Sequence, residues 1–249
     1  MDITRLCRAA VRVVRDEGWI ALFVRAARFS RYLLGRTFRV ERVYVCRFDL
    51  AGLESWPRPT VPRGVEVWVV ASNDDAEVLA RQGFEDVREL ILRAERSLDA
   101  GCVALCIYHG RRLAHVGWVA CSARAKERID DVPYAVDFAH GEACTGGVFT
   151  FSEYRGRGLM PYSFRLRLEY LARTGRLASL AVVDRANTAS LRAMSRVGPF
   201  VRRSVFHVKL PGVNYVRDDG PVEQVLQSLN ERVEAADALA GHASTIDRT

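Results

Sequence analysis

Lysine is almost absent from this sequence: Lys126 and Lys209 are two of the 37 basic residues, and all the others are arginine. The net charge of +7 lies within residues 1–47, where eleven arginines outnumber four acidic residues, so the rest of the chain is neutral. An arginine bias of this kind is typical of a genome rich in G and C. Because the excess is confined to one end of the chain, we predict no nucleic-acid partner.

Long apolar runs and paired cysteines are also missing. No apolar stretch reaches the ~18 residues of a membrane-spanning helix, and Arg5, Arg8, Arg12 and Arg15 interrupt the region where a secretory signal has its apolar core. The six cysteines include no C-x-x-C pair, which predicts reduced thiols in a cytoplasmic protein. The histidines have no ligand spacing, so no metal site is expected.

The apolar pattern divides the chain into three parts. Residues 1–41 form a basic, amphipathic helical arm, residues 42–212 the main domain, and residues 213–249 a C-terminal helix after Pro221 and a flexible tail. The arm's broad apolar face favours docking on the main domain. The alternative is that residues 1–36 contact an anionic membrane surface.

Strands and helices alternate only in the C-terminal half of the main domain. Strands are expected at 42–48, 65–70, 102–108, 113–121, 136–138, 143–151, 178–183 and 200–210, and helices at 74–82, 85–98, 159–174 and 188–197. Residues 122–133 are expected to be irregular. This order predicts an α/β fold (mixed α+β) with a mixed, mostly antiparallel sheet and helices on both faces.

The most informative segment is the strand Gly147–Phe151, followed by Ser-Glu-Tyr-Arg-Gly-Arg-Gly-Leu and an amphipathic helix. A glycine-rich turn at a helix N-terminus is a site for a phosphate group, because backbone N–H groups and the helix dipole converge there. Gly156 and Gly158 allow the backbone to approach a ligand closely. The position between a strand and a helix argues against a low-complexity RNA-binding tail.

A second pattern follows about thirty residues later, where a strand ends at Val182-Val183-Asp184 and Asn187 opens a helix that Gly198 terminates. Asn187 is a good helix cap, with Ser190 one turn along.

Together these two segments resemble the signature of the GNAT superfamily of acyl-CoA-dependent N-acyltransferases. Arg155 and Gly158 match its Arg/Gln-x-x-Gly-x-Gly/Ala motif, with Met160 in place of the last small residue. The resemblance covers residues 147–210 and implies the GNAT fold. It also implies an acetyl-CoA (acyl-CoA) cosubstrate, held by a set of residues on the strand, the loop and the second helix: Phe149, Thr150, Phe151, Arg155, Gly156, Arg157, Gly158, Leu159, Met160, Asn187 and Ser190.

One departure from the family concerns mechanism. Many members have a Tyr seven residues after the Asn, which is thought to protonate the leaving thiolate, and this chain has Met194 there. Ser195, Tyr215 or a water molecule are candidate replacements. Asp137, His140 and Glu142 are candidates for the group that takes the amine's proton.

The acceptor is not encoded in the motifs. The loop is similar to that of GNAT proteins in bacterial polysaccharide and secondary-metabolite pathways, which implies a small-molecule primary amine such as an amino sugar or amino acid. Two alternatives stay open: an acyl carrier protein as donor, which would meet the arginine-rich arm, and a GNAT-like binding module without catalysis. Whether the chain forms a homodimer is also open.

Overall fold

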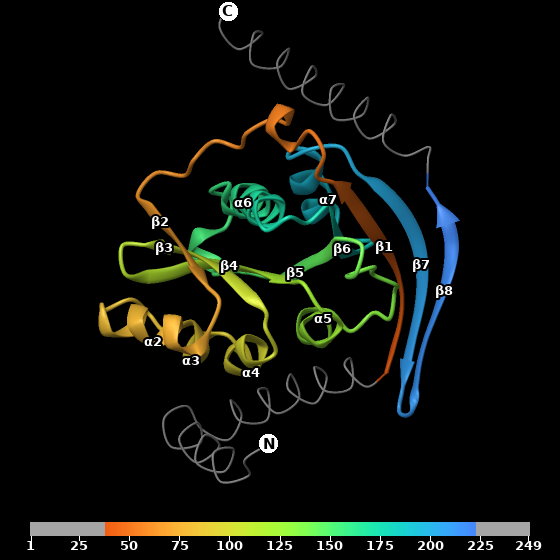
Figure 1. Ribbon diagram of the computed structural model, residues 1–249, viewed down its shortest axis with the longest axis horizontal. Helices are drawn as coiled ribbons and strands as arrows, with labels where there is room; N and C mark the ends of the chain where they lie inside the picture. The colour runs from red at the N-terminus through yellow and green to blue at the C-terminus, as the bar shows by residue number, and fades with distance from the viewer. Residues whose placement is uncertain (1–37, 223–249) are drawn as a thin grey trace, which may run out of the picture. The chain divides into compact units, whose positions relative to one another are not determined.

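The computed structural model describes residues 38–222 (Figure 1). Residues 1–37 of the helical arm predicted at 1–41, and the helix expected after Pro221, therefore lie outside the described residues, whereas residues 39–41 belong to a strand. The chain divides into two compact units, each described here by itself. The small unit includes Phe38–Glu41 and His207–Val216, and in it the buried His207 contacts Glu41 through Nδ1 (3.1 Å) and Asn214 through Nε2 (2.8 Å).

An eight-stranded sheet forms the centre of the fold, with strand order β2-β3-β4-β5-β6-β1-β7-β8. The strands are β1 (Arg39–Asp49), β2 (Val65–Val70), β3 (Val103–His109), β4 (Arg112–Ala120), β5 (Glu142–Thr150), β6 (Ala178–Asp184), β7 (Val201–Leu210) and β8 (Val213–Pro221). β5 and β6 are parallel, whereas β2, β3, β4 and β5 pair with one another antiparallel, as do β1 and β6.

Helices cover both faces of this sheet in the large unit (Figure 1). They are α2 (Asn73–Arg81), α3 (Val87–Leu90), α4 (Ala94–Asp99), α5 (Ala123–Ile129), α6 (Leu159–Arg173) and α7 (Thr188–Ser195). One core, which includes Phe48, Phe164 and Leu168, lies under α6 and α7, and another, which includes Phe84, Leu98 and Trp118, lies under α2–α5. The predicted mixed α/β fold with helices on both faces is confirmed.

Four details differ from the sequence-based expectations. The helix expected at 85–98 is broken into α3 and α4, because Ile91 is extended and Arg93 has a left-handed φ of 72°. Residues 123–129 form α5, capped by the Ser122 hydroxyl, which accepts the Ala125 N–H at 3.2 Å. Residues 136–138 form no strand, and 213–221 form the unexpected strand β8.

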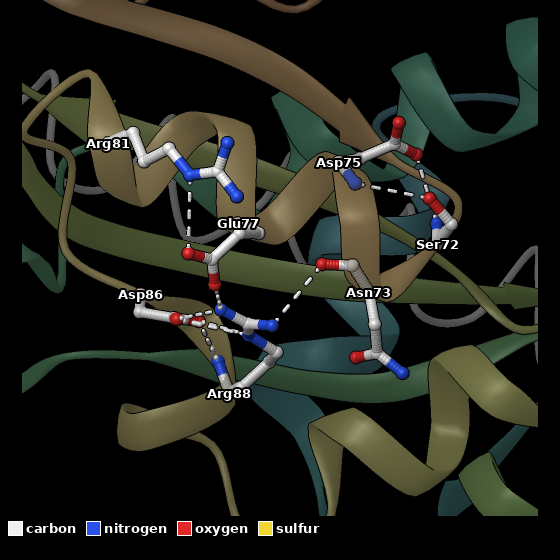
Figure 2. A network of polar contacts seen from close by, with 7 residues as sticks. All are labelled: Ser72, Asn73, Asp75, Glu77, Arg81, Asp86 and Arg88. Carbon is white, nitrogen blue, oxygen red and sulfur yellow. Dashed lines mark hydrogen bonds and ion pairs between the residues drawn. The ribbon is translucent and has the colours of Figure 1, made fainter.

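A polar network ties the start of α2 to α3 (Figure 2). Ser72 caps α2 in a reciprocal capping box with Asp75. Arg88 donates to Glu77 (2.7 Å) and Asp86 and to the carbonyl of Asn73 (3.2 Å). Hydrogen bonds from Arg88 and then from Arg81 lower the pKa of Glu77. None of the residues in this network lines the cavity described below.

Cys46, Cys102, Cys106 and Cys144 are buried free thiols and Cys121 is half-buried, as predicted for core residues. None of the helices between residues 38 and 222 is long and apolar enough to cross a membrane. In the same part of the chain, no group of three or more His, Cys, Asp and Glu side chains has an arrangement that could hold a metal ion.

Candidate functional site

The site begins where β5 and β6 separate. Within the described residues these strands pair only over Glu142–Cys144 and Ala178–Leu180. Beyond that point β6 continues along β1, whereas β5 follows β4 and leaves its other edge unpaired.

A β-bulge in β5 bends the strand at this point. Two residues, Gly147 and Val148, lie opposite the single residue Gly117 of β4. Gly147 has φ of 57°, and a Cβ there would lie 2.9 Å from Cδ1 of Trp118. The bulge therefore needs glycine both for its backbone conformation and for the space beside the indole.

A cavity of about 200 Å³ fills the space between the separated strands. Its walls come from β5, β6, α6 and α7, and consist of Thr145, Gly146, Gly147, Val148, Met160, Phe164, Arg167, Ala181, Val182, Val183, Asp184, Asn187, Ser190 and Met194. On α6 the lining residues Met160, Phe164 and Arg167 are four and three positions apart, which places them on one face of the helix. The cavity is therefore a cleft, and this face of α6 forms one of its walls.

The glycine loop lies at the N-terminus of α6. Gly156 and Gly158 both have φ of 75°, and a Cβ on either would have no atom within 4 Å. Among the described residues, none accepts a hydrogen bond from the N–H groups of 157–160. Free N–H groups at the positive end of a 15-residue helix form a site for an anion.

α7 contributes the opposite wall through Asn187, Ser190 and Met194. The Asn187 side-chain oxygen caps the helix by accepting the Ser190 N–H at 3.1 Å, which leaves its amide N–H groups available to a ligand. Met194 is buried and lines the cavity, so the position where the family has Tyr faces the cleft with a thioether that cannot donate a proton.

The structure brings together part of the set of cofactor-binding residues predicted from the sequence. Met160, Asn187 and Ser190 line the cavity. Arg157 and Leu159 of the loop instead line a second cavity of about 240 Å³. The stretch of β5 that lines it is Thr145–Val148 rather than Phe149–Phe151. Thr150 instead contacts His115 Nδ1 through its hydroxyl (2.7 Å) and accepts from Arg155 Nε through its carbonyl (3.2 Å).

The four predicted catalytic residues do not line this cavity. Asp137 and His140 form an exposed pair (2.7 Å), and Glu142 forms an ion pair with Arg47. Glu142 begins β5, three residues and roughly 10 Å before Thr145, the first residue of β5 that lines the cavity, at ~3.3 Å per residue, and Asp137 and His140 lie just before the strand. Ser195 is exposed at the end of α7 and donates to the Arg192 carbonyl. Their catalytic role remains a prediction that the geometry of the cleft does not favour.

Sequence reasoning missed a group of buried polar residues beside the cleft. Arg167 is 1% exposed, and its Nη2 has no hydrogen-bond partner among the described residues. Burial lowers the pKa of Arg167 to about 9. His115 is fully buried on β4, and burial, followed by the nearby charge of Arg167, lowers its pKa to about 3. The signal in the sequence was Arg167 itself, an arginine on the apolar face of α6 that Phe164 and Leu168 define.

Comparison with known proteins finds no protein-family model and no curated protein that matches the chain. Solved structures do match. A GCN5-related N-acetyltransferase from Sphaerobacter thermophilus is 18% identical, with a TM-score of 0.43, over 78% of this chain and 56% of its own length. A tandem GNAT protein from the clavulanic acid biosynthesis pathway is 15% identical, with a TM-score of 0.46, over 80% of this chain and 59% of its own.

A GCN5-related N-acetyltransferase-like protein from Streptococcus suis is 15% identical, with a TM-score of 0.40, over 81% of this chain and 67% of its own. The chain therefore spans little more than half the length of the first two of these structures. Most of the matching structures are named as GCN5-related or GNAT acetyltransferases, the superfamily that the sequence resembles.

Proposed function

We propose that the protein is an N-acyltransferase that moves an acetyl or longer acyl group from acyl-CoA to a primary amine of a small molecule. The observation that supports this is the cleft between β5 and β6, which leads from an anion site at the start of α6 to a bulge in β5. An acyl-CoA molecule carries a pyrophosphate, an amide-bearing arm and a thioester in that order. The residues of the cleft offer a partner to each.

The loop suits the pyrophosphate. Its free N–H groups are backbone donors at a helix N-terminus, and Gly156 and Gly158 keep the approach open because neither has a side chain. The unpaired edge of β5 suits the amide-bearing arm, since an extended ligand can pair with it as an added strand. Asn187 has side-chain amide N–H groups free on the facing wall.

The chemistry is amide formation at the thioester. The amine nitrogen attacks the carbonyl carbon, the C–S bond breaks, and the proton lost by the amine ends on the departing thiolate. Met194 cannot supply that proton, which leaves water or the Ser190 hydroxyl as the donor on this wall of the cleft. Backbone N–H groups near the bulge can stabilise the oxyanion, and the walls hold the reactants together.

The acceptor class rests on the resemblance of the loop and is an amino sugar or amino acid. Met194 also favours a second candidate function, a GNAT-like module that binds acyl-CoA without turning it over. A carrier-protein donor would depend on the arginine-rich arm, which lies outside the described residues.

Replacing Gly158 by Val tests the cofactor site. Valine is strained at φ of 75° and its side chain would enter the approach to the loop. We expect the affinity for acetyl-CoA, measured by calorimetry, to fall tenfold or more. Gly175→Val is the matched control: Gly175 has φ of 77°, also has no atom within 4 Å of a Cβ, and follows the other end of α6.

The control should lose similar stability and keep its affinity for acetyl-CoA. Equal affinity in Gly158→Val and the unmodified protein would remove the basis of the proposal. Release of free CoA in the presence of a panel of amines then distinguishes the enzyme from the module, because the module binds acetyl-CoA but releases none of its thiol.

A further inference from the structure

Arg167 is a buried cation without a counter-charge. Its side chain extends from the middle of α6 against Gly117 of β4, where an added Cβ would lie only 2.8 Å from Nε. Nε donates a long hydrogen bond to the Ser163 carbonyl (3.4 Å), and the guanidinium lies over the Phe164 ring at 5.1 Å. No ion pair joins Arg167 to an acid among the described residues.

Arg165, on the same helix, is a buried arginine whose partners belong to the chain. It is 3% exposed, donates to Glu169 at 2.7 Å and also binds the Trp56 carbonyl at 3.2 Å. An unpaired buried charge is strongly unfavourable, by several kcal/mol in real proteins. Arg202 is likewise buried with unpartnered nitrogens, so it is the position of Arg167 on the wall of the cavity that points to a bound molecule as its partner.

The surroundings of Arg167 do not neutralise it. The neighbouring imidazole of His115 is kept uncharged by burial and by Arg167 itself. Asp184 also lines the cavity, but it is exposed, and its Oδ1 accepts the Ala186 N–H at 2.7 Å. Thr145, 3% exposed on the opposite wall, has a hydroxyl that likewise has no partner among the described residues.

Both unpartnered groups line the same cavity. The acceptor that suits a guanidinium N–H and a hydroxyl together is a carboxylate, which an arginine binds with strong, charge-assisted hydrogen bonds. We propose that Arg167 and Thr145 bind a carboxylate of the substrate in this cleft. The inference rests on the function proposed above, and it adds that one of the two substrates is an acid.

The carboxylate can belong to the acyl group, as in the thioester of a dicarboxylic acid, or to the acceptor, as in an amino acid. Two arms of one experiment distinguish these sources in the full chain. The donor arm compares the affinity for succinyl-CoA with that for acetyl-CoA by calorimetry. The acceptor arm compares the KM of amino acids with that of the corresponding amino-acid amides, with acetyl-CoA as donor.

We expect a preference of at least tenfold for the acid in one arm. Arg167→Met should abolish that preference, measured as the ratio between the acid and its uncharged counterpart. Arg165→Met is the control, because it removes an equally buried arginine whose partners belong to the chain, and it should retain the preference. Arg167→Met should also melt no lower than the unmodified protein, since it removes an unpaired buried charge.

The inference is overturned if the unmodified protein prefers the acid in neither arm, or if the preference survives in Arg167→Met. If Arg167→Met fails to fold, Thr145→Val takes its place, and a preference unchanged in that variant also refutes the assignment. Failure of the proposed function gives a different result, namely that neither acetyl-CoA nor succinyl-CoA binds, and the inference then falls with it.

Discussion

The stability of the fold should depend on pH through His115, and the structure gives the size of the effect. In the unfolded chain a histidine has a pKa of about 6.5, whereas burial and the charge of Arg167 lower the pKa of His115 to about 3 in the fold. Between these two values the unfolded chain binds a proton that the folded protein does not. The free energy of unfolding therefore has its full value above pH ~6.5, and it decreases as the pH falls from there towards 3.

The magnitude follows from about 1.4 kcal/mol per pH unit for one proton. From pH 7 to pH 5, His115 should lower the free energy of unfolding by about 2 kcal/mol. The comparison is with His115→Gln, which cannot titrate but keeps an amide that can reach the Thr150 hydroxyl, the partner of His115 Nδ1 at 2.7 Å.

Urea denaturation of both proteins at pH 7, 6 and 5 measures the difference. The variant should start less stable at pH 7 and lose about 2 kcal/mol less on acidification, because the other titrating groups are common to both proteins. Parallel losses in the two proteins would show that His115 is protonated in the fold, and that the neutral surroundings inferred for Arg167 are wrong.

Met194→Ala should change kcat less than tenfold, because a thioether donates no proton, and a thousandfold loss in a folded variant would instead show a chemical role for this position. Gly198→Ala should lower the free energy of unfolding, measured in urea, by about 1–3 kcal/mol, since the new Cβ would clash with Cε3 of Trp56; unchanged stability would mean that the indole moves freely. Arg88→Met should destabilise the protein at pH 7 and less so below pH ~4, because Arg88 keeps the pKa of Asp86 low despite its burial, and that contribution is lost as the carboxyl protonates. A pH-independent effect in denaturation experiments would refute that reason.

The parts of this protein that the sequence determined by itself are those with a local cause. Glycines at 156 and 158 have the positive φ expected of a tight turn, and Ser72 and Asn187 cap their helices, because each feature depends on a few neighbouring residues. The alternation of apolar residues likewise predicted seven strands of the mixed sheet, from β1 to β7, but not β8. The cap at Ser122 was present too, but the charged residues after it concealed a helix.

The cleft was decided only by the tertiary structure. It exists because β5 leaves β6 after Cys144 and bends at Gly147, and both events depend on pairing between segments about 35 residues apart. For the same reason the sequence could not show that Thr145–Val148, rather than Phe149–Phe151, line the cavity on β5, or that the catalytic candidates Asp137, His140 and Glu142 do not line it. The orientation of Arg167 was equally hidden, because its local pattern does not say whether an arginine on an apolar helix face meets an acid, solvent or an open cavity. Only packing against Gly117 and the opening of the cleft beside it show that this charge faces the cavity.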